Sequence, residues 1–198
     1  MPLSGKPSDS KKYLERLKVI SPTPITQVAD IAKVIDFFGY LGEWKVDYKI
    51  RSVQSSLQSE KITCVEAAII SYGLLELLFP QVKRCILLIH RRDKQGEECG
   101  HCVTLYWGKN GKIGVFSKSS YAGFGHRDTI YDSELDVARS FAEGYLNMGF
   151  SPLYYGITTL EEAAGDLDWR YSEDDITHLS ERLLQYYQYF FEVEKNGT

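Results

Sequence analysis

Apolar residues recur with two different spacings along the chain. A helical spacing runs through 25–38, after the capping pair Thr23-Pro24, and again through 133–147, where Ser133 is followed three residues later by Asp136. Residues 64–79 are apolar at nearly every position, which predicts a buried central helix. Shorter helices are expected over 10–19 and from Thr159 to Gly165, and an amphipathic helix rich in aromatic residues over 174–193.

A period of two, or a short apolar run, predicts the strands. Residues 44–51 alternate between apolar and charged side chains, and the stretches 82–90, 101–107 and 112–117 are short apolar runs. Asn110-Gly111 between the last two favours a tight antiparallel hairpin. Residues 152–158 are expected to be extended. Loops are expected over the remaining polar or glycine-rich stretches, at 54–59, 91–100 and 119–127.

This order of elements predicts an α+β fold, in which a central helix packs on an antiparallel sheet between N- and C-terminal helices. The 198 residues, 43% hydrophobic and 25% charged, suit one domain. We expect a flexible tail over 1–9 and a single domain over 10–198, with a core at 44–120 and a C-terminal helical part at 133–194.

Charge and hydropathy narrow the classes of partner. A net charge of −4 argues against general binding to nucleic acid. The chain contains no run of about 18 apolar residues that would span a membrane. Residues 1–9 lack the apolar segment of a secretory signal, so we expect a cytoplasmic protein whose four cysteines are reduced.

Cys64 differs from the other three cysteines in its position. Thr63 and Glu66 match the capping box that starts a helix, which makes Cys64 the first helical residue. The free N–H groups and the positive end of the helix dipole favour a thiolate there. Cys64 is therefore the candidate nucleophile, although a small buried residue that only packs would show the same pattern.

A thiol nucleophile needs an imidazole to accept its proton. His101 begins a strand, and alternation places it with Val103, Leu105 and Trp107 on an apolar face that we expect to meet the central helix. His126, in a glycine-rich loop, is the second choice.

The third member of such a site would orient the imidazole. Ser117 on the returning strand is expected to point to the same side as His101, and it holds an imidazole more weakly than a carboxylate does. Asp128 or Asp93 could supply a carboxylate from a loop instead, and the sequence does not choose among the three.

A metal site is not expected at Cys99-Gly100-His101-Cys102. Along an extended strand Cys99 and His101 face one way and Cys102 the other, so these ligands do not converge. No phosphate-binding glycine motif occurs either, and we expect no cofactor.

Three segments carry a resemblance to a known group of proteins. The order of a cysteine at the start of a central helix, a histidine on a strand and a polar residue on the next strand resembles the core of the transglutaminase-like superfamily, relatives of papain-type thiol enzymes, in an uncharacterised bacterial branch. The segments are 63–68, 100–105 and 112–117, and the similarity continues through Tyr131. Where the superfamily usually has Asp or Asn, this chain has Ser117.

The resemblance implies acyl-transfer chemistry. Cys64 would attack an amide or ester carbonyl, with His101 as base and then acid, and Ser117 as its partner. Substrates would be peptides, amides or small acyl compounds, and the reaction that of an amidohydrolase, peptidase or acyltransferase. The alternative is a non-catalytic binding or assembly module descended from this fold.

Overall fold

The computed structural model describes residues 15–21, 24–42, 49–170, 176, 178–187 and 189–190. The tail predicted over 1–9, most of the strand predicted over 44–51, and the ends of the helix predicted over 174–193 lie outside these residues. Residues 15–20 are helical, within the helix predicted over 10–19. No helix in the described part of the chain combines the length and hydropathy needed to cross a bilayer.

The fold is α+β and is built on an antiparallel sheet with the strand order β6-β5-β4-β3-β7-β8. These strands are β3 (Arg84–Arg92), β4 (Glu98–Trp107), β5 (Ile113–Phe116), β6 (Arg127–Tyr131), β7 (Ser151–Thr158) and β8 (Tyr189–Phe190). A separate pair of short parallel strands, β1 (Gly39–Gly42) and β2 (Lys61–Thr63), precedes the central helix.

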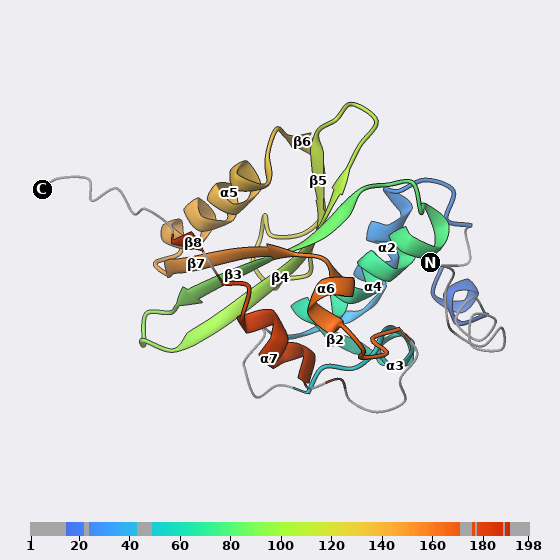
Figure 1. The fold of residues 1–198 in the computed structure, drawn as a ribbon, viewed down its shortest axis with the longest axis horizontal. Coiled ribbons are helices and arrows are strands. Elements are labelled where there is room, and N and C mark those ends of the chain that lie inside the picture. The colour runs from blue at the N-terminus through green and yellow to red at the C-terminus, as the bar shows by residue number, and fades with distance from the viewer. Residues whose placement is uncertain are drawn as a thin grey trace, which may run out of the picture.

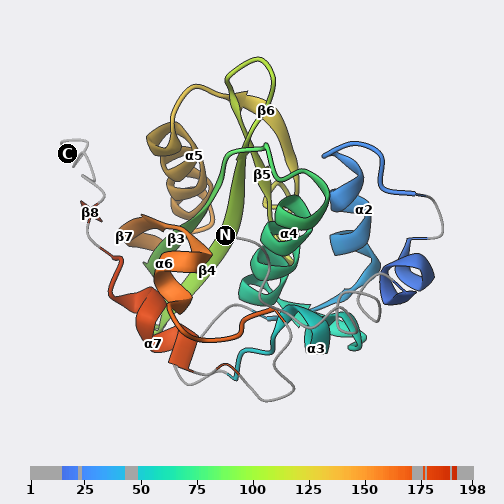
Figure 2. The same ribbon diagram turned by 45° about the vertical axis from the view of Figure 1, so that its right-hand side comes forward.

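Helices cover both faces of the sheet (Figures 1 and 2). Helix α5 (Glu134–Asn147) lies on one face, whereas α4 (Cys64–Leu78), α6 (Leu160–Ala164) and α7 (His178–Leu184) lie on the other. Helix α2 (Asp30–Phe37) and the short helix α3 (Val53–Leu57) pack beside α4. The sheet therefore separates two hydrophobic clusters, one around α4 and one around α5.

Helix α4 is the predicted central helix. Every residue from Cys64 to Leu75 is buried, as expected for a helix with apolar residues all round. Thr63 caps it through the predicted capping box, and the chain leaves the helix at Phe79, before Pro80. Ser133 caps α5 and Thr159 caps α6, also as predicted.

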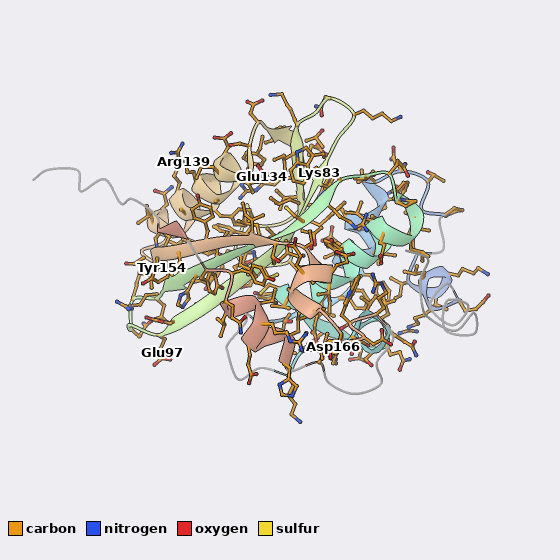
Figure 3. All side chains as sticks on the ribbon, in the orientation of Figure 1. Lys83, Glu97, Glu134, Arg139, Tyr154 and Asp166 are labelled. Atoms are coloured by element: carbon orange, nitrogen blue, oxygen red, sulfur yellow. The ribbon has the colours of Figure 1, made fainter. Side chains whose placement is uncertain are left out.

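The central hairpin is longer than predicted. Strands β3 and β4 pair from Arg84–Tyr106 to Arg92–Glu98, so the charged stretch expected as a loop over 91–100 contributes to both strands. Asp93 closes the short turn, since its carboxylate accepts hydrogen bonds from the amides of Gln95 and Glu97; Glu97 is labelled there in Figure 3. Arg91 is buried, so charge along this stretch did not indicate exposure.

Three other predicted elements differ from the structure. Helix α2 begins at Asp30 rather than after Thr23, because the Asp30 carboxylate accepts hydrogen bonds from the amides of Thr26 and Gln27 and fixes a turn there. The polar loop expected over 54–59 contains α3, which Ser52 caps. No strand is predicted after the loop over 119–127, but β6 begins at Arg127 and pairs with β5.

The C-terminal part is not only helical. The segment expected to be extended over 152–158 is β7, which pairs with β3 from Ile86–Thr158 to Arg92–Ser151. The closing helix predicted over 174–193 is α7, which ends at Leu184, and the chain then returns as β8 along β7. Gly156 allows this return, because a Cβ at that position would lie 1.9 Å from the Tyr186 carbonyl oxygen.

Candidate active site

Cys64 occupies the first position of α4. The Thr63 hydroxyl accepts a hydrogen bond from the Glu66 amide (3.2 Å), and the Glu66 carboxylate accepts one from the Thr63 amide (2.9 Å). Cys64 is fully buried, and its thiol Sγ lies 3.8 Å from the carbonyl oxygen of Gly100 on β4. The thiol therefore lies beside the residue that precedes His101.

His101 is buried on the opposite face of β4 from the one that α4 covers. Thr104 Oγ1 donates a hydrogen bond to the Ala68 carbonyl of α4 (2.7 Å), so the face bearing Thr104 meets this helix. The His101 ring instead contacts Phe124, Phe141 and Tyr145, with ring centroids 5.6–6.4 Å apart. The prediction that the His101 face of the strand meets the central helix is wrong.

The physical reason is that both faces of β4 are covered and apolar. Val103 and Leu105 belong to the cluster around α5, whereas Cys102 and Tyr106 belong to the cluster around α4. A strand buried on both faces has apolar side chains on each side. Its sequence therefore does not show which face a given helix covers. The thiol and the imidazole thus meet β4 at adjacent residues, but they do not share one face of it.

Ser117 lies beside His101. Its Oγ is 2.9 Å from His101 Nε2, and both side chains are buried. Strands β4 and β5 pair only from Thr104–Phe116 to Trp107–Ile113, so Ser117 lies just past the end of this pairing. The predicted contact between Ser117 and His101 is present.

The other predicted candidates do not contact this pair. His126 packs its ring on Phe116 (centroids 5.0 Å apart), which belongs to the cluster around α4, and its Nδ1 lies 2.9 Å from the Val115 carbonyl oxygen. Asp128 is exposed and lies 3.5 Å from His126 Nε2. Asp93 is committed to the hairpin turn. Ser117 is therefore the candidate that the fold brings to His101.

All four cysteines are free thiols, and three of them are buried. Burial raises the pKa of the Cys85 thiol to about 12 and also raises the pKa of Cys102. Cys99 is partly exposed near the hairpin turn. In the described part of the chain, no three His, Cys, Asp or Glu side chains converge as ligands of a metal ion.

A buried arginine lies on the His101 face of the sheet, and no motif or spacing in the sequence indicated its burial. Arg91 is 1% exposed, and its guanidinium packs 4.3 Å from the Tyr145 ring centroid and 4.1 Å from that of Phe150. Tyr145 also contacts the His101 ring, so one aromatic side chain lies between the cation and the imidazole. Such packing of a guanidinium on ring faces is favourable.

Tyr187 lies over the Cys64 side of the sheet. Its ring stacks on His90, with centroids 5.2 Å apart, and His90 pairs directly with Gly100 across β3 and β4. Burial raises the pKa of the Tyr187 phenol well above 10, and Cys102, Cys64 and Cys99 raise it further. From sequence, the aromatic run around Tyr187 indicates core or an oligomer contact first, and a shelf for a ligand second.

Comparison with models of known protein families and with curated proteins finds no match for this chain.

Proposed function

We propose that this protein is a cysteine-dependent acyl-transfer enzyme with a core of the transglutaminase-like kind. Cys64 is the nucleophile, His101 is the base and then the acid, and Ser117 orients the imidazole. The substrate is a peptide, an amide or a small acyl compound. The reduced state of its cysteines suits a cytoplasmic location, which belongs to the same proposal.

The observation that carries the proposal is the order of contacts around His101. Ser117 Oγ lies 2.9 Å from His101 Nε2, and the Cys64 thiol lies against the carbonyl of the preceding residue, Gly100, on the other face of β4. A nucleophile, a base and an orienting group therefore come from α4, β4 and the end of β5. Thiol acyl transfer needs these three roles and also an imidazole within reach of the thiol, so the proposal requires His101 to reach the α4 face of β4 during the reaction.

The chemistry proceeds in two halves. In the proposed reaction the imidazole reaches the α4 face of β4, the Cys64 thiol gives its proton to His101, and the sulfur adds to the carbonyl carbon of the substrate. Backbone N–H groups in the first turn of α4 donate to the resulting oxyanion. When the tetrahedral adduct collapses, the bond to the leaving group breaks and the imidazolium returns its proton to the leaving amine or alcohol. The product of this half is a thioester on Cys64.

Water or an amine then attacks the thioester carbonyl, and His101 accepts its proton. Collapse of the second adduct breaks the carbon–sulfur bond and releases an acid or a new amide. The proton returns to the sulfur, which restores the thiol. Ser117 positions the resting imidazole through its contact with Nε2.

Acetylation by p-nitrophenyl acetate tests this function without knowledge of the natural substrate. We expect release of p-nitrophenol and an acetyl group on the peptide that contains Cys64, identified by mass spectrometry. Cys64→Ser removes this label and His101→Ala slows its formation at least tenfold. The partly exposed Cys99 serves as an internal measure of ordinary thiol reactivity. Equal labelling of Cys64 and Cys99 in the wild type and in His101→Ala contradicts the proposal.

A binding or assembly module is the second candidate function. The observation that favours it is that Cys64 and His101 are both 0% exposed, while a serine stands where a carboxylate would hold the imidazole more firmly. A module of this kind leaves Cys64 unlabelled by the ester under native conditions, and His101→Ala then changes only stability.

A further inference from the structure

The side chain that completes the capping box of α4 carries a charge close to the proposed nucleophile. Glu66 is fully buried, two residues after Cys64, and its carboxylate must accept the hydrogen bond from the Thr63 amide. An acceptor oxygen is needed there, but a negative charge in the first turn disfavours a thiolate at Cys64. The geometry of the cap and the chemistry of the thiol therefore place opposite demands on this residue.

Arg51 resolves this conflict because its guanidinium donates hydrogen bonds to both carboxylate oxygens of Glu66. Its Nε lies 2.6 Å from Oε1, its Nη2 lies 2.8 Å from Oε2, and its own backbone amide donates to Oε1 (3.2 Å). Such a two-pronged pair with a carboxylate is the strongest geometry available to arginine. The positive charge of Arg51 thus neutralises the negative charge of Glu66 directly at its carboxylate.

Other contacts hold the guanidinium in place. Arg51 Nη2 also donates to the Lys61 carbonyl of β2 (2.9 Å), and Nη1 donates to Ser59 Oγ. The Arg51 side chain is 27% exposed, whereas that of Glu66 is buried, so the pair closes the start of α4 toward solvent. A backbone carbonyl and a side-chain hydroxyl thus act as acceptors that hold this permanent positive charge in place.

We propose that Arg51 is a positioning residue for Cys64: it cancels the charge of Glu66 and fixes the first turn of α4, so that this turn stays electropositive around the thiol. This role rests on the proposed function of Cys64 as a nucleophile. It adds to that function a residue outside the proposed set of Cys64, His101 and Ser117.

The elements packed around Cys64 carry other titratable or charged groups, which stay unchanged in the variants below. They include Lys61 on β2, Arg84, Cys85, His90, Arg91 and Arg92 on β3, Glu98, Cys99, His101 and Cys102 on β4, and Tyr187 after α7. A change in the pH dependence of Cys64 that follows Arg51 and Glu66 together is therefore assigned to this ion pair.

The test is the rate of Cys64 alkylation by iodoacetamide between pH 5 and 9 in the full-length protein. Arg51→Met leaves the Glu66 charge unmatched, and we expect the midpoint of the pH profile to rise by about one unit. Arg51→Lys keeps the positive charge, and we expect its midpoint to stay close to that of the wild type. The double variant Arg51→Met/Glu66→Gln restores the midpoint, because Gln keeps the acceptor oxygen for Thr63 without the charge.

Glu162→Gln is the matched control, since Glu162 closes the equivalent capping box of α6. We expect this variant to leave the midpoint of the Cys64 profile unchanged. An unchanged midpoint in Arg51→Met, or no rescue by Glu66→Gln, overturns the proposal and leaves Arg51 a purely structural ion pair. If Arg51→Met does not fold, the single variant Glu66→Gln decides. Its midpoint falls below that of the wild type if the proposal holds, and is unchanged if the proposal is wrong.

This outcome is separable from that of the enzyme proposal. If His101→Ala leaves the Cys64 rate unchanged while Arg51→Met shifts the midpoint, the acyl-transfer function fails and the role of Arg51 stands. If His101→Ala slows Cys64 and Arg51→Met does not shift the midpoint, the reverse holds.

Discussion

His101 Nε2 and Ser117 Oγ lie 2.9 Å apart in the buried interior, on the face of the sheet that α5 covers. This contact holds one nitrogen of the imidazole against a hydroxyl group. A serine provides a neutral acceptor here. The charge that usually helps an imidazolium form is absent from this position, so we expect a base that is well oriented but weakly assisted.

Removal of the Ser117 hydroxyl tests its orienting role. We expect Ser117→Ala to lower the rate of Cys64 acetylation by about tenfold, and to cost about 1 kcal/mol in the free energy of unfolding because a buried partner of His101 is lost. Ser119→Ala is the control, since Ser119 caps a turn by accepting from the Tyr121 amide. A Ser117→Ala protein with the wild-type acetylation rate rules out this orienting role.

The two capping boxes separate helix stability from thiol reactivity. Thr63→Ala and Thr159→Ala each remove a cap of the same type, from α4 and α6, and each should cost about 1 kcal/mol in denaturant unfolding. Only Thr63→Ala should also slow Cys64 alkylation, because only α4 presents its first turn to that thiol. A similar slowing in Thr159→Ala would show that the rate reports general loosening of the fold.

Tyr187 is the aromatic residue whose removal tests access to Cys64. Tyr187 stacks on His90 beside the cross-strand pair that contacts the thiol. We expect Tyr187→Ala to raise the native-state rate of Cys64 alkylation by about tenfold. Tyr154→Ala, which removes the other ring stacked on His90, is the control with little effect; Tyr154 is labelled on β7 in Figure 3.

Cys85 reports whether the fold stays intact in that experiment. It lies in the cluster on the other face of the sheet and should remain unreactive in every folded variant. Labelling of Cys85 together with Cys64 would mean that Tyr187→Ala unfolds the protein rather than uncovers the thiol.

His90 makes stability depend on pH. Burial lowers the pKa of His90 below its ordinary value of 6.5, and the opposing effect of Glu98 is smaller. The unfolded chain therefore binds a proton more readily than the folded protein, so stability is fully present above about pH 6.5 and falls as the pH drops toward the folded pKa. Urea unfolding at pH 7.5 and 5.5 should show this loss, and His90→Gln should reduce it. An equal loss in His90→Gln would assign the dependence to other groups.

Local signals in the sequence predicted the helix starts well. Thr63, Ser133 and Thr159 each cap a helix where the capping pattern indicated, because a hydroxyl followed by an acidic residue satisfies amides within one turn. The start of α2 was missed because the Asp30 carboxylate folds back onto Thr26 and Gln27, a competition between cap and turn that spacing does not resolve.

Tertiary relationships were the part that the sequence left open. The face on which His101 lies depends on which helix covers which side of a strand buried on both sides, and Val103 and Cys102 look alike in this respect. Arg51 and Glu66 are fifteen residues apart, and neither a motif nor a period connects them. The contact between His101 and Ser117 was predictable because it needs only the alternation of two adjacent strands.

The most direct test of the central claim is the relative alkylation rate of Cys64 at pH 6.5, measured for each cysteine by mass spectrometry in wild-type protein and in His101→Ala. The account predicts that Cys64 reacts much faster than Cys85, Cys99 and Cys102 in the wild type, and that His101→Ala removes most of this advantage. Equal rates for all four thiols, or a Cys64 rate that His101→Ala does not change, would contradict it.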